Sequence, residues 1–313
     1  MIFEHKPVLL SEVIENLDIK PGGVYIDGTV GGAGHSTEIY KRLGEKGILV
    51  GLDQDEFALE TSRKRLYELN KKSRIILENI NFKSIKEVCL SNNLEAVDGI
   101  LLDLGVSSHQ LDEAERGFSY NKDAPLDMRM DRRSGFSAET LVNEYSFEDI
   151  KNIIRDYSEE KWAARIAEFI VERRKEARIR TTGELVDIIM AAIPVAARRE
   201  GPHPAKRTFQ ALRIAVNDEL GILKGTIADG VSVLKPGGRF LIITFHSLED
   251  RIVKTEFLRH ANPCTCPPEF PVCVCGKKPS AQLVTRKPLT ASKEELEMNP
   301  RSRSAKLRVL KKI

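Results

Sequence analysis

The chain has 313 residues, of which 41% are apolar and 30% are charged. This balance is typical of a globular protein with a real hydrophobic core, in one large domain or two modest ones. The net charge of +3 neither requires nor excludes a nucleic-acid partner. No apolar stretch approaches the roughly 20 residues that span a bilayer, and the first six residues do not look like a signal peptide. We therefore expect a cytoplasmic protein without a membrane partner.

Short apolar runs alternate with helical patterns over the first hundred residues. Strands are predicted over 24–26, 47–52, 74–77 and 97–102. Helices are predicted between them over 36–43, 56–70 and 82–90. Strands that alternate with helices indicate right-handed crossovers and a mostly parallel sheet.

The pattern changes after the fourth strand. Between residues 110 and 200 no convincing strand is found, and apolar residues recur at helical spacing over 147–157, 162–170 and 185–192. The sequence therefore predicts an all-α domain inserted into an α/β sheet of the Rossmann-like type.

Beyond the insertion, the α/β pattern resumes. The predicted elements are a long helix over 208–234, a turn at Lys235-Pro-Gly-Gly238, a strand over 239–244, and a closing antiparallel hairpin of 283–285 with 306–310. The predicted domain boundaries are 1–108 and 207–313 for the two parts of the sheet domain and 109–206 for the helical insertion.

A glycine-rich segment, Asp27-Gly-Thr-Val-Gly-Gly-Ala-Gly-His35, separates the first strand from its helix. Glycines such as Gly28 let the backbone approach a ligand closely, and the start of a helix offers unpaired N–H groups. By itself the segment indicates either a nucleotide-binding loop or a plain turn.

Acidic residues stand at the ends of three predicted strands, at Asp27, Asp53 and Asp103. Ligands of open α/β sheets bind beyond the carboxyl ends of the strands, so we expect these acids to converge on one crevice. Asp53 follows the glycine-rich segment by about 20 residues, where an acid reaches the ribose hydroxyls of an adenosine. Each aspartate could instead cap a helix.

The charge of the predicted site limits the choice of cofactor. The strict spacing G-x-G-x-x-G is absent, and three acids disfavour a pyrophosphate but suit a cofactor that carries an amine and a sulfonium. The turn Lys235-Pro-Gly-Gly238 also looks like a hallmark of S-adenosylmethionine-dependent methyltransferases. We therefore predict S-adenosyl-L-methionine rather than a nicotinamide.

Longer strings of sequence carry a closer resemblance. They are His5-Lys-Pro-Val-Leu-Leu10, Asp103-Leu-Gly-Val-Ser-Ser-His-Gln-Leu-Asp112, Arg116-Gly-Phe-Ser119, Pro125-Leu-Asp-Met-Arg-Met-Asp131, Arg207-Thr-Phe-Gln-Ala-Leu-Arg213, Phe245-His-Ser-Leu-Glu-Asp-Arg251 and Asn299-Pro-Arg-Ser-Arg-Ser304. Over essentially its whole length, the chain resembles the bacterial 16S ribosomal RNA (cytosine-N4)-methyltransferase H family.

The resemblance implies an enzyme that methylates the exocyclic N4 of a cytidine in the decoding region of 16S ribosomal RNA, within the small ribosomal subunit. Carried over by motif, the cofactor contacts are Ala33, Gly34, His35, Asp53, Phe82, Asp103 and Gln110. Phe82 suits an apolar adenine face, although a core residue is the alternative. Many amine methyltransferases carry Asp/Asn-Pro-Pro-Tyr where this chain has Asp103-Leu-Gly-Val. The way in which that motif accepts the protons of the amine therefore cannot be assumed for this chain.

Four residues are candidates for the chemistry. Asp103 is the candidate acceptor of hydrogen bonds from the cytosine amine, although it could serve only the cofactor. His246, Ser247 and Glu249 follow the fifth strand and are candidates to line the base pocket, with a structural histidine as the alternative for His246. A strong general base is not required, because positioning and oriented dipoles supply most of the rate.

Basic residues recur in the insertion and near the end of the sequence. The clusters are Arg129, Arg132 and Arg133; Arg173, Arg174, Lys175, Arg178 and Arg180; Lys206, Arg207 and Arg213; and the basic residues from Arg301 onward. Such runs are more often solvated helix faces, but their recurrence favours a salt-sensitive RNA-binding surface. The target cytidine must be unpaired or flipped out to react.

Four cysteines, Cys264, Cys266, Cys273 and Cys275, form two C-x-C pairs in a proline-rich segment. They could hold a structural zinc, although the spacing is tighter than usual, or be free or redox-active thiols. The resembled family needs no metal for its reaction.

Two other functions stay open. One is a non-catalytic RNA-binding ribosome-assembly factor, and the other is a nicotinamide-dependent oxidoreductase, for which no Tyr-x-x-x-Lys pair stands near the strand ends. The sequence leaves open whether the protein forms a homodimer and which form of the RNA is the substrate.

Overall fold

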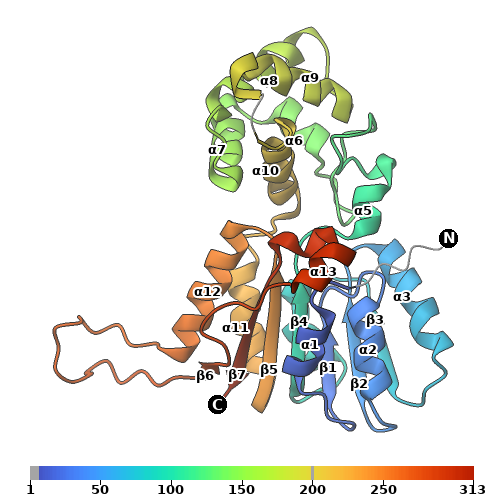
Figure 1. Ribbon diagram of the computed structural model, residues 1–313, viewed down its shortest axis with the longest axis vertical. Helices are drawn as coiled ribbons and strands as arrows, with labels where there is room; N and C mark the ends of the chain where they lie inside the picture. Colours follow the sequence, from blue (N-terminus) through green and yellow to red (C-terminus); the bar gives the residue numbers. More distant parts are fainter. Residues whose placement is uncertain (1–6, 199–200) are drawn as a thin grey trace. The chain divides into compact units, whose positions relative to one another are not determined.

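The computed structural model describes residues 7–198 and 201–313, and the chain forms two compact units (Figure 1). The α/β unit comprises Met1–Gly105 and Leu220–Ile313, and the helical unit comprises Val106–Glu219. The first six residues, including His5 and Lys6, lie outside the described residues. Among the residues described, no helix is long and apolar enough to cross a membrane.

The α/β unit is built on a seven-stranded sheet in the order β3-β2-β1-β4-β5-β7-β6 (Figure 1). The strands are β1 Val24–Asp27, β2 Ile48–Leu52, β3 Arg74–Glu78, β4 Val97–Asp103, β5 Leu234–Thr244, β6 Ala281–Leu283 and β7 Lys306–Lys312. The first five strands in the order are parallel, and β7 is antiparallel to β5 and β6. The predicted parallel sheet is confirmed.

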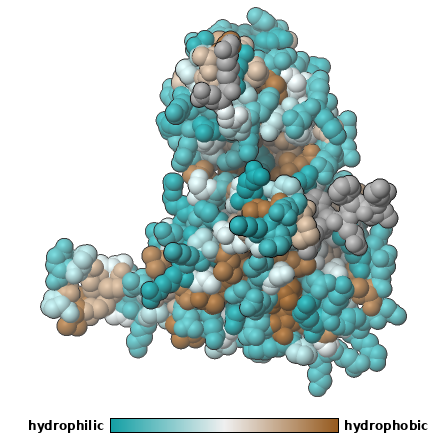
Figure 2. All heavy atoms as spheres, viewed as in Figure 1, coloured by the Kyte–Doolittle hydropathy of each residue, from teal (hydrophilic) through white to brown (hydrophobic). Residues whose placement is uncertain are grey.

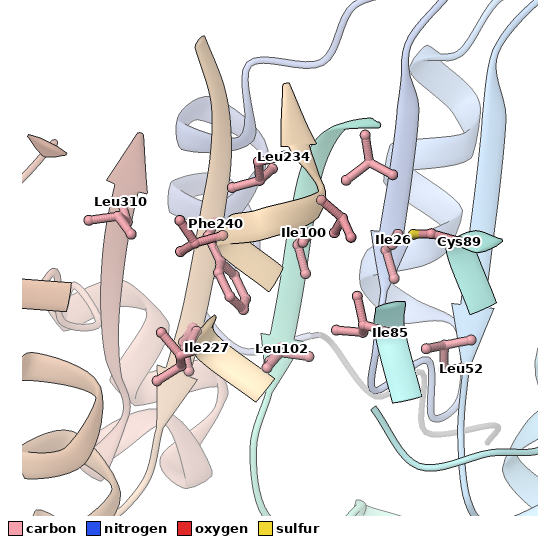
Figure 3. Packing of buried hydrophobic residues seen from close by; sticks show 14 of the residues in the cluster. Ile26, Leu52, Ile85, Cys89, Ile100, Leu102, Ile227, Leu234, Phe240 and Leu310 are labelled. Atoms are coloured by element: carbon pink, nitrogen blue, oxygen red, sulfur yellow. The ribbon is translucent and has the colours of Figure 1, made fainter. Parts of the chain in front are cut away.

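Helices cover both faces of this sheet. They are α1 Leu10–Leu17, α2 Gly34–Arg42, α3 Glu56–Glu68, the 3-10 turn η1 Phe82–Ser84, α4 Ile85–Ser91, α11 Leu223–Val233, α12 Ser247–Ala261, α13 Lys293–Met298 and the 3-10 turn η4 Pro300–Ser304. Successive strand residues point to opposite faces, so Ile100 and Leu102 join one core and Leu101 joins the other. Figure 3 shows the first core, where Phe240 and Ile227 pack beside Ile100 and Leu102.

In the described residues of the helical unit, 106–198 and 201–219, the named elements are all helices or 3-10 turns. They are α5 Ser108–Asp112, η2 Ala114–Arg116, α6 Ala138–Glu144, α7 Phe147–Ser158, α8 Ala163–Glu176, α9 Thr182–Ala192, η3 Val195–Arg198 and α10 Ala205–Asn217. Its core takes Ile150 and Ile154 from α7, Ile166 and Ile170 from α8, and Leu185 from α9. These are the predicted apolar faces, so the all-α insertion is confirmed.

The single helix predicted over 208–234 is wrong. Helix α10 ends at Asn217, because Asp218 adopts a left-handed conformation with φ of 49° and caps it. Helix α11 begins only at Leu223. Residues 207–219 belong to the helical unit, where Phe209 and Leu212 of α10 join the core.

Two further details of the sheet differ from the expectation. The predicted turn at 235–238 lies inside β5 as an irregularity, where Leu234 pairs with Val97 and Arg239 pairs with Gly99, and Gly237 has a φ of 83°. The closing antiparallel pair forms, but its first strand is β6 rather than 283–285. Helix α13 and η4 connect its strands in place of a tight turn.

Candidate active site

The three predicted acids lie at one edge of the sheet. Asp27 ends β1 and pairs in register with Gly51 and Leu101, the residue two positions before Asp103. Asp53 directly follows β2, and Asp103 ends β4. Because the three strands are parallel neighbours, their carboxyl ends meet at the same edge.

Asp27 is buried and anchored by the loop that follows it. Its carboxylate accepts hydrogen bonds from the Ser36 hydroxyl at 2.6 Å and from the Thr29 backbone N–H at 3.2 Å. Burial raises the pKa of Asp27, although the Ser36 hydrogen bond opposes the shift. Asp27 therefore ties β1 to the first turn of α2.

Asp53 ties the glycine-rich loop to β2. Its carboxylate accepts hydrogen bonds from the backbone N–H groups of Gly31 and Asp55, at 2.9 and 2.8 Å. Burial raises the pKa of Asp53 to about 7, because hydrogen bonds from two neutral amides do not offset the loss of solvent. A carboxylate has about four acceptor positions, so Asp53 keeps capacity for a ligand hydroxyl.

Asp103 lies at the centre of the edge and has an unused acceptor. Its Oδ2 lies 3.7 Å from His35 Nδ1, while Oδ1 is buried and has no hydrogen-bond partner among the described residues. Its backbone N–H donates to the Thr29 hydroxyl at 2.6 Å. Burial raises the pKa of Asp103 to about 6, and His35 opposes this.

His35 is the buried second residue of α2 and connects two segments. Its Nε2 lies 2.9 Å from the Val8 carbonyl oxygen. A carbonyl only accepts, so this contact places the hydrogen on Nε2 and directs Nδ1 toward Asp103. His35 thus orients its ring against the Asp103 carboxylate.

The glycine-rich loop is shaped by its backbone. A Cβ at Gly28 would lie 2.4 Å from Leu102 Cδ2, so a larger residue there would require the Leu102 side chain to shift. Gly31 and Ala33 have positive φ values of 49° and 61°, which turn the chain into α2. Ala33 caps α2 without a side-chain hydrogen bond, so the first N–H groups of α2 have no side-chain cap.

Phe82 begins the 3-10 turn η1, which Asn81 caps. Its ring is half-buried and packs against the sheet core, and its Cβ is among the atoms that a Cβ at Gly28 would meet. Phe82 is therefore both a core residue and a neighbour of the glycine-rich loop.

His246, Ser247 and Glu249 form the N-terminus of α12, at the same edge. Glu249 is 1% exposed and accepts hydrogen bonds from the backbone N–H groups of Phe245 and His246, at 2.8 and 3.3 Å. His246 Nε2 lies 3.1 Å from the other oxygen of Glu249. Ser247 is exposed. His246 Nδ1 in turn accepts from the Glu249 N–H at 3.5 Å, so His246 and Glu249 form the capping box of α12 together and Ser247 alone of the three is exposed.

Gln110 belongs to the helical unit, whereas the other predicted cofactor contacts belong to the α/β unit. It is buried, and its side chain accepts a hydrogen bond from the Ser107 backbone N–H at 3.0 Å in the capping box of α5. Its role in cofactor binding stays a prediction.

Thr29, Ser36 and Val8 were missed by the sequence reasoning. Thr29 accepts from the Asp103 backbone, Ser36 donates to Asp27, and Val8 binds His35. Thr29 lies inside the glycine-rich segment and Ser36 directly follows it, and this position is the signal in the sequence for both. Val8 lies in the string His5-Lys-Pro-Val-Leu-Leu10, which carries part of the resemblance but does not indicate a contact with His35.

Many predicted RNA-binding cations are paired inside the protein. Arg129 binds Asp127, Arg133 binds Asp131, and Arg178 binds Glu139 and Glu144. Arg173, Lys175 and Arg213 also pair, with Glu176, Glu172 and Glu219 respectively. Most of these pairs are exposed, and exposed pairs contribute little to stability.

Comparison with known proteins decides the family. The family model described as the MraW methylase family matches residues 2–313. The chain belongs to the MraW methylase family. A relative from Acetivibrio thermocellus, named ribosomal RNA small subunit methyltransferase H, is 72% identical over 313 residues, or 100% of both chains. Relatives of the same name from Ruminiclostridium cellulolyticum and Clostridioides difficile are 64% and 57% identical, again over 100% of both chains.

Membership of this methylase family removes support for the oxidoreductase alternative. A methylase also fits the charge at the strand ends of the α/β unit, because the acidic residues there suit a cationic methyl donor better than a pyrophosphate. The enzyme class is therefore a methyltransferase, and its cofactor is S-adenosyl-L-methionine.

Proposed function

We propose that this MraW-family protein transfers a methyl group from S-adenosylmethionine to the exocyclic N4 of a cytidine in the decoding region of 16S ribosomal RNA. Its relatives of 57 to 72% identity are named as methyltransferases of small-subunit ribosomal RNA. The N4 atom and the decoding region follow from the resemblance of the long sequence strings, and they are the part of the proposal that needs a direct test.

The observation that carries the proposal is the set of strand-end acids. Asp27, Asp53 and Asp103 have no Lys or Arg partner among the described residues, and burial raises the pKa of each. Buried carboxylates are costly unless a cation accompanies them. A ligand with a sulfonium and an amine would supply that positive charge.

The residues of the edge fit this cofactor. Asp103 Oδ1 is a buried acceptor without a donor among the described residues, and a cofactor amine or hydroxyl would supply one. We assign Asp53 to the ribose hydroxyls, Phe82 to the adenine face and the loop from Ala33 to His35 to the amino-acid end. When bound, the cofactor supplies an electrophilic methyl group.

Asp103 is the residue that we place at the target amine. The N4 lone pair of cytosine is delocalised into the ring, and a hydrogen bond from the amine to a carboxylate localises it on nitrogen. His35 Nδ1 lies 3.7 Å from the Asp103 carboxylate, and the Thr29 hydroxyl fixes the backbone at the same residue by accepting from its N–H. No strong base is needed, because the amine proton becomes acidic once the methyl is transferred.

The N-terminus of α12 is our candidate wall for the base. His246 and Ser247 lie there, and Glu249 holds the turn by accepting from two backbone N–H groups. We therefore propose that Glu249 positions the segment, while His246 and Ser247 face the base.

We further propose that the small ribosomal subunit, in the cytoplasm, is the partner. On this proposal the α/β unit binds the cofactor and carries the chemistry, and the basic residues of the helical unit bind the RNA backbone. Because several of those cations already pair with carboxylates, they would exchange these partners for phosphates, and the affinity for RNA should fall as the salt concentration rises.

The test is methyl transfer from radiolabelled S-adenosylmethionine to small subunits that lack the modification, followed by nucleoside analysis. Label in N4-methylcytidine is expected. Label in another nucleoside would overturn the target atom. Cofactor binding without transfer to subunits or free RNA would favour a non-catalytic ribosome-assembly factor.

A further inference from the structure

The segment between α12 and β6 is a long loop without regular secondary structure. It runs through residues 262–280, contains no helix or strand, and projects from the α/β unit (Figure 1). Loops of this length that have no secondary structure are uncommon in compact domains unless they are functional or held by another constraint. The four clustered cysteines all lie in this segment.

The cysteine sulfurs converge on one point. Cys264, Cys266, Cys273 and Cys275 place their Sγ atoms all within 4.8 Å of one another. Cys273 Sγ lies 3.5 Å from Cys264, 3.8 Å from Cys266 and 3.5 Å from Cys275, and the Cys264–Cys275 distance is 3.9 Å. Two C-x-C pairs on separate stretches thus meet despite their tight spacing.

These distances match the edges of a metal–sulfur tetrahedron. Zinc binds thiolates at about 2.3 Å, so four sulfurs around one ion lie roughly 3.8 Å apart. A disulfide would need an S–S distance of about 2.05 Å, and the closest pair here is 3.5 Å apart. A cluster of four sulfurs also offers no reason to prefer one pair over another.

A backbone hydrogen bond also reaches into the cysteine cluster. The Val274 N–H donates a hydrogen bond to Cys266 Sγ at 3.3 Å. Hydrogen bonds to a charged sulfur are stronger than those to a neutral thiol, and they orient the ligand for a cation. Val274 lies between Cys273 and Cys275, so one C-x-C pair supports the other.

The segment lacks a core of its own. Phe270 is 50% exposed, and Val272 and Val274 are each 71% exposed. The projecting segment carries apolar colour on its surface in Figure 2. Apolar side chains that stay in solvent do not fold a segment, so its order requires a cross-link.

We propose that Cys264, Cys266, Cys273 and Cys275 bind one structural zinc ion that folds this segment. Four thiolates fill the coordination sphere and leave no open position for water or substrate, so the ion has no part in methyl transfer. The role of the zinc ion is to make this otherwise flexible loop of the α/β unit rigid.

The experiment is metal analysis of full-length protein, purified under reducing conditions and dialysed against metal-free buffer. We expect about one zinc per chain, as for other closed tetrathiolate sites. The Cys264→Ser/Cys273→Ser variant should lose it, whereas Cys89→Ala, which removes the buried cysteine of α4, should retain it. Replacement by cobalt should give the visible absorption bands of a tetrahedral thiolate site in the wild type only.

A second readout is tryptic cleavage after Lys277, because Pro279 protects the bond after Lys278 from trypsin. Zinc-loaded protein should resist cleavage after Lys277, and removal of the metal by a chelator should expose this site while the rest of the chain stays intact. The proposal is overturned if reduced protein holds no zinc and takes up none on titration. It is equally overturned if the double serine variant keeps full zinc, or if iron fills the site at the same stoichiometry.

Discussion

In the helical unit, Asp127 binds Arg129 and Asp131 binds Arg133, with N···O distances of 2.6 and 2.8 Å. Burial alone would raise the pKa of Asp127, but the hydrogen bonds from Arg129 lower it. The hydrogen bond from Arg133 lowers the pKa of Asp131 in the same way. These carboxylates are neutralised within their own unit.

At the strand ends of the α/β unit, burial acts on the carboxylates without a guanidinium to oppose it. The pKa of Asp53 rises to about 7 and that of Asp103 rises to about 6. Titratable groups with strongly shifted pKa values concentrate at functional sites. The opposite directions of the pKa shifts distinguish carboxylates that pair with arginine in the structure from carboxylates for which we propose a cationic ligand.

The largest effect is expected at Asp103. Replacement by Asn keeps the shape but removes the charge, and loss of one oriented acceptor in an active site costs about 100- to 1000-fold in kcat. Single-turnover transfer to unmodified small subunits measures this. Unchanged turnover with weaker cofactor binding would assign Asp103 to the cofactor alone.

Removing the cation from a paired carboxylate of the helical unit should lower the stability of the protein and not its turnover. Arg213 donates two hydrogen bonds to Glu219, at 2.8 and 3.0 Å, and Glu219 is 8% exposed. Arg213→Gln should lower the free energy of unfolding by about 3 kcal/mol, because a nearly buried carboxylate loses its cation. Urea unfolding measures this. Loss of activity in a variant of undiminished stability would break the comparison between the units.

Asp53 should affect affinity rather than turnover. Asp53→Asn is expected to weaken S-adenosylmethionine binding by about 10- to 30-fold, because a charged acceptor for the ribose hydroxyls is lost. Calorimetric titration gives the Kd. Equal affinity for wild type and variant would remove Asp53 from the ribose.

Cofactor binding should depend on pH in the range of the shifted groups. Folding holds the protons of Asp53 and Asp103 more tightly than the unfolded chain does, so these groups lower the stability of the ligand-free protein as pH rises from near 3.8 to about 7. A cationic ligand binds the ionised form and reverses this sign. Affinity should rise roughly tenfold between about pH 6 and about pH 8. Much of that dependence should disappear in Asp53→Asn.

The smallest effect is expected at an exposed pair of the helical unit. Asp156 lies beside Arg155, with an N···O distance of 2.7 Å, and both side chains are more than half exposed. Asp156→Asn should leave both the thermal midpoint and the transfer rate unchanged, since water screens the pair. A marked fall in transfer alone would show that this surface contacts the substrate.

The sequence predicted the features that repeat locally. Strand-end acids and the glycine-rich turn are visible because their spacing follows from the βαβ unit, and the apolar faces of α7 to α9 follow from helical periodicity. The break between α10 and α11 escaped, because apolar residues continue at helical spacing through Leu220 and Leu223 while Asp218 turns left-handed.

Contacts between distant segments were beyond local reasoning. The Val8 carbonyl meets His35, and the Thr29 hydroxyl meets the Asp103 backbone, only after the strands have assembled. The same applies to Glu249, whose expected place in the base pocket gave no hint that it caps α12. The spacing of the two cysteine pairs left a zinc site open as one alternative, and only the fold shows that the four sulfurs lie within 4.8 Å of one another.

The position of β7 sets the order in which the sheet can be made. This strand lies between β5 and β6, although it follows both along the chain. During synthesis, which proceeds at roughly 5–20 residues per second, the helical unit emerges complete while the sheet still lacks an inner strand. A nascent chain therefore holds an open sheet edge for several seconds, and it is in that interval that a chaperone or misplaced strand would compete with β7.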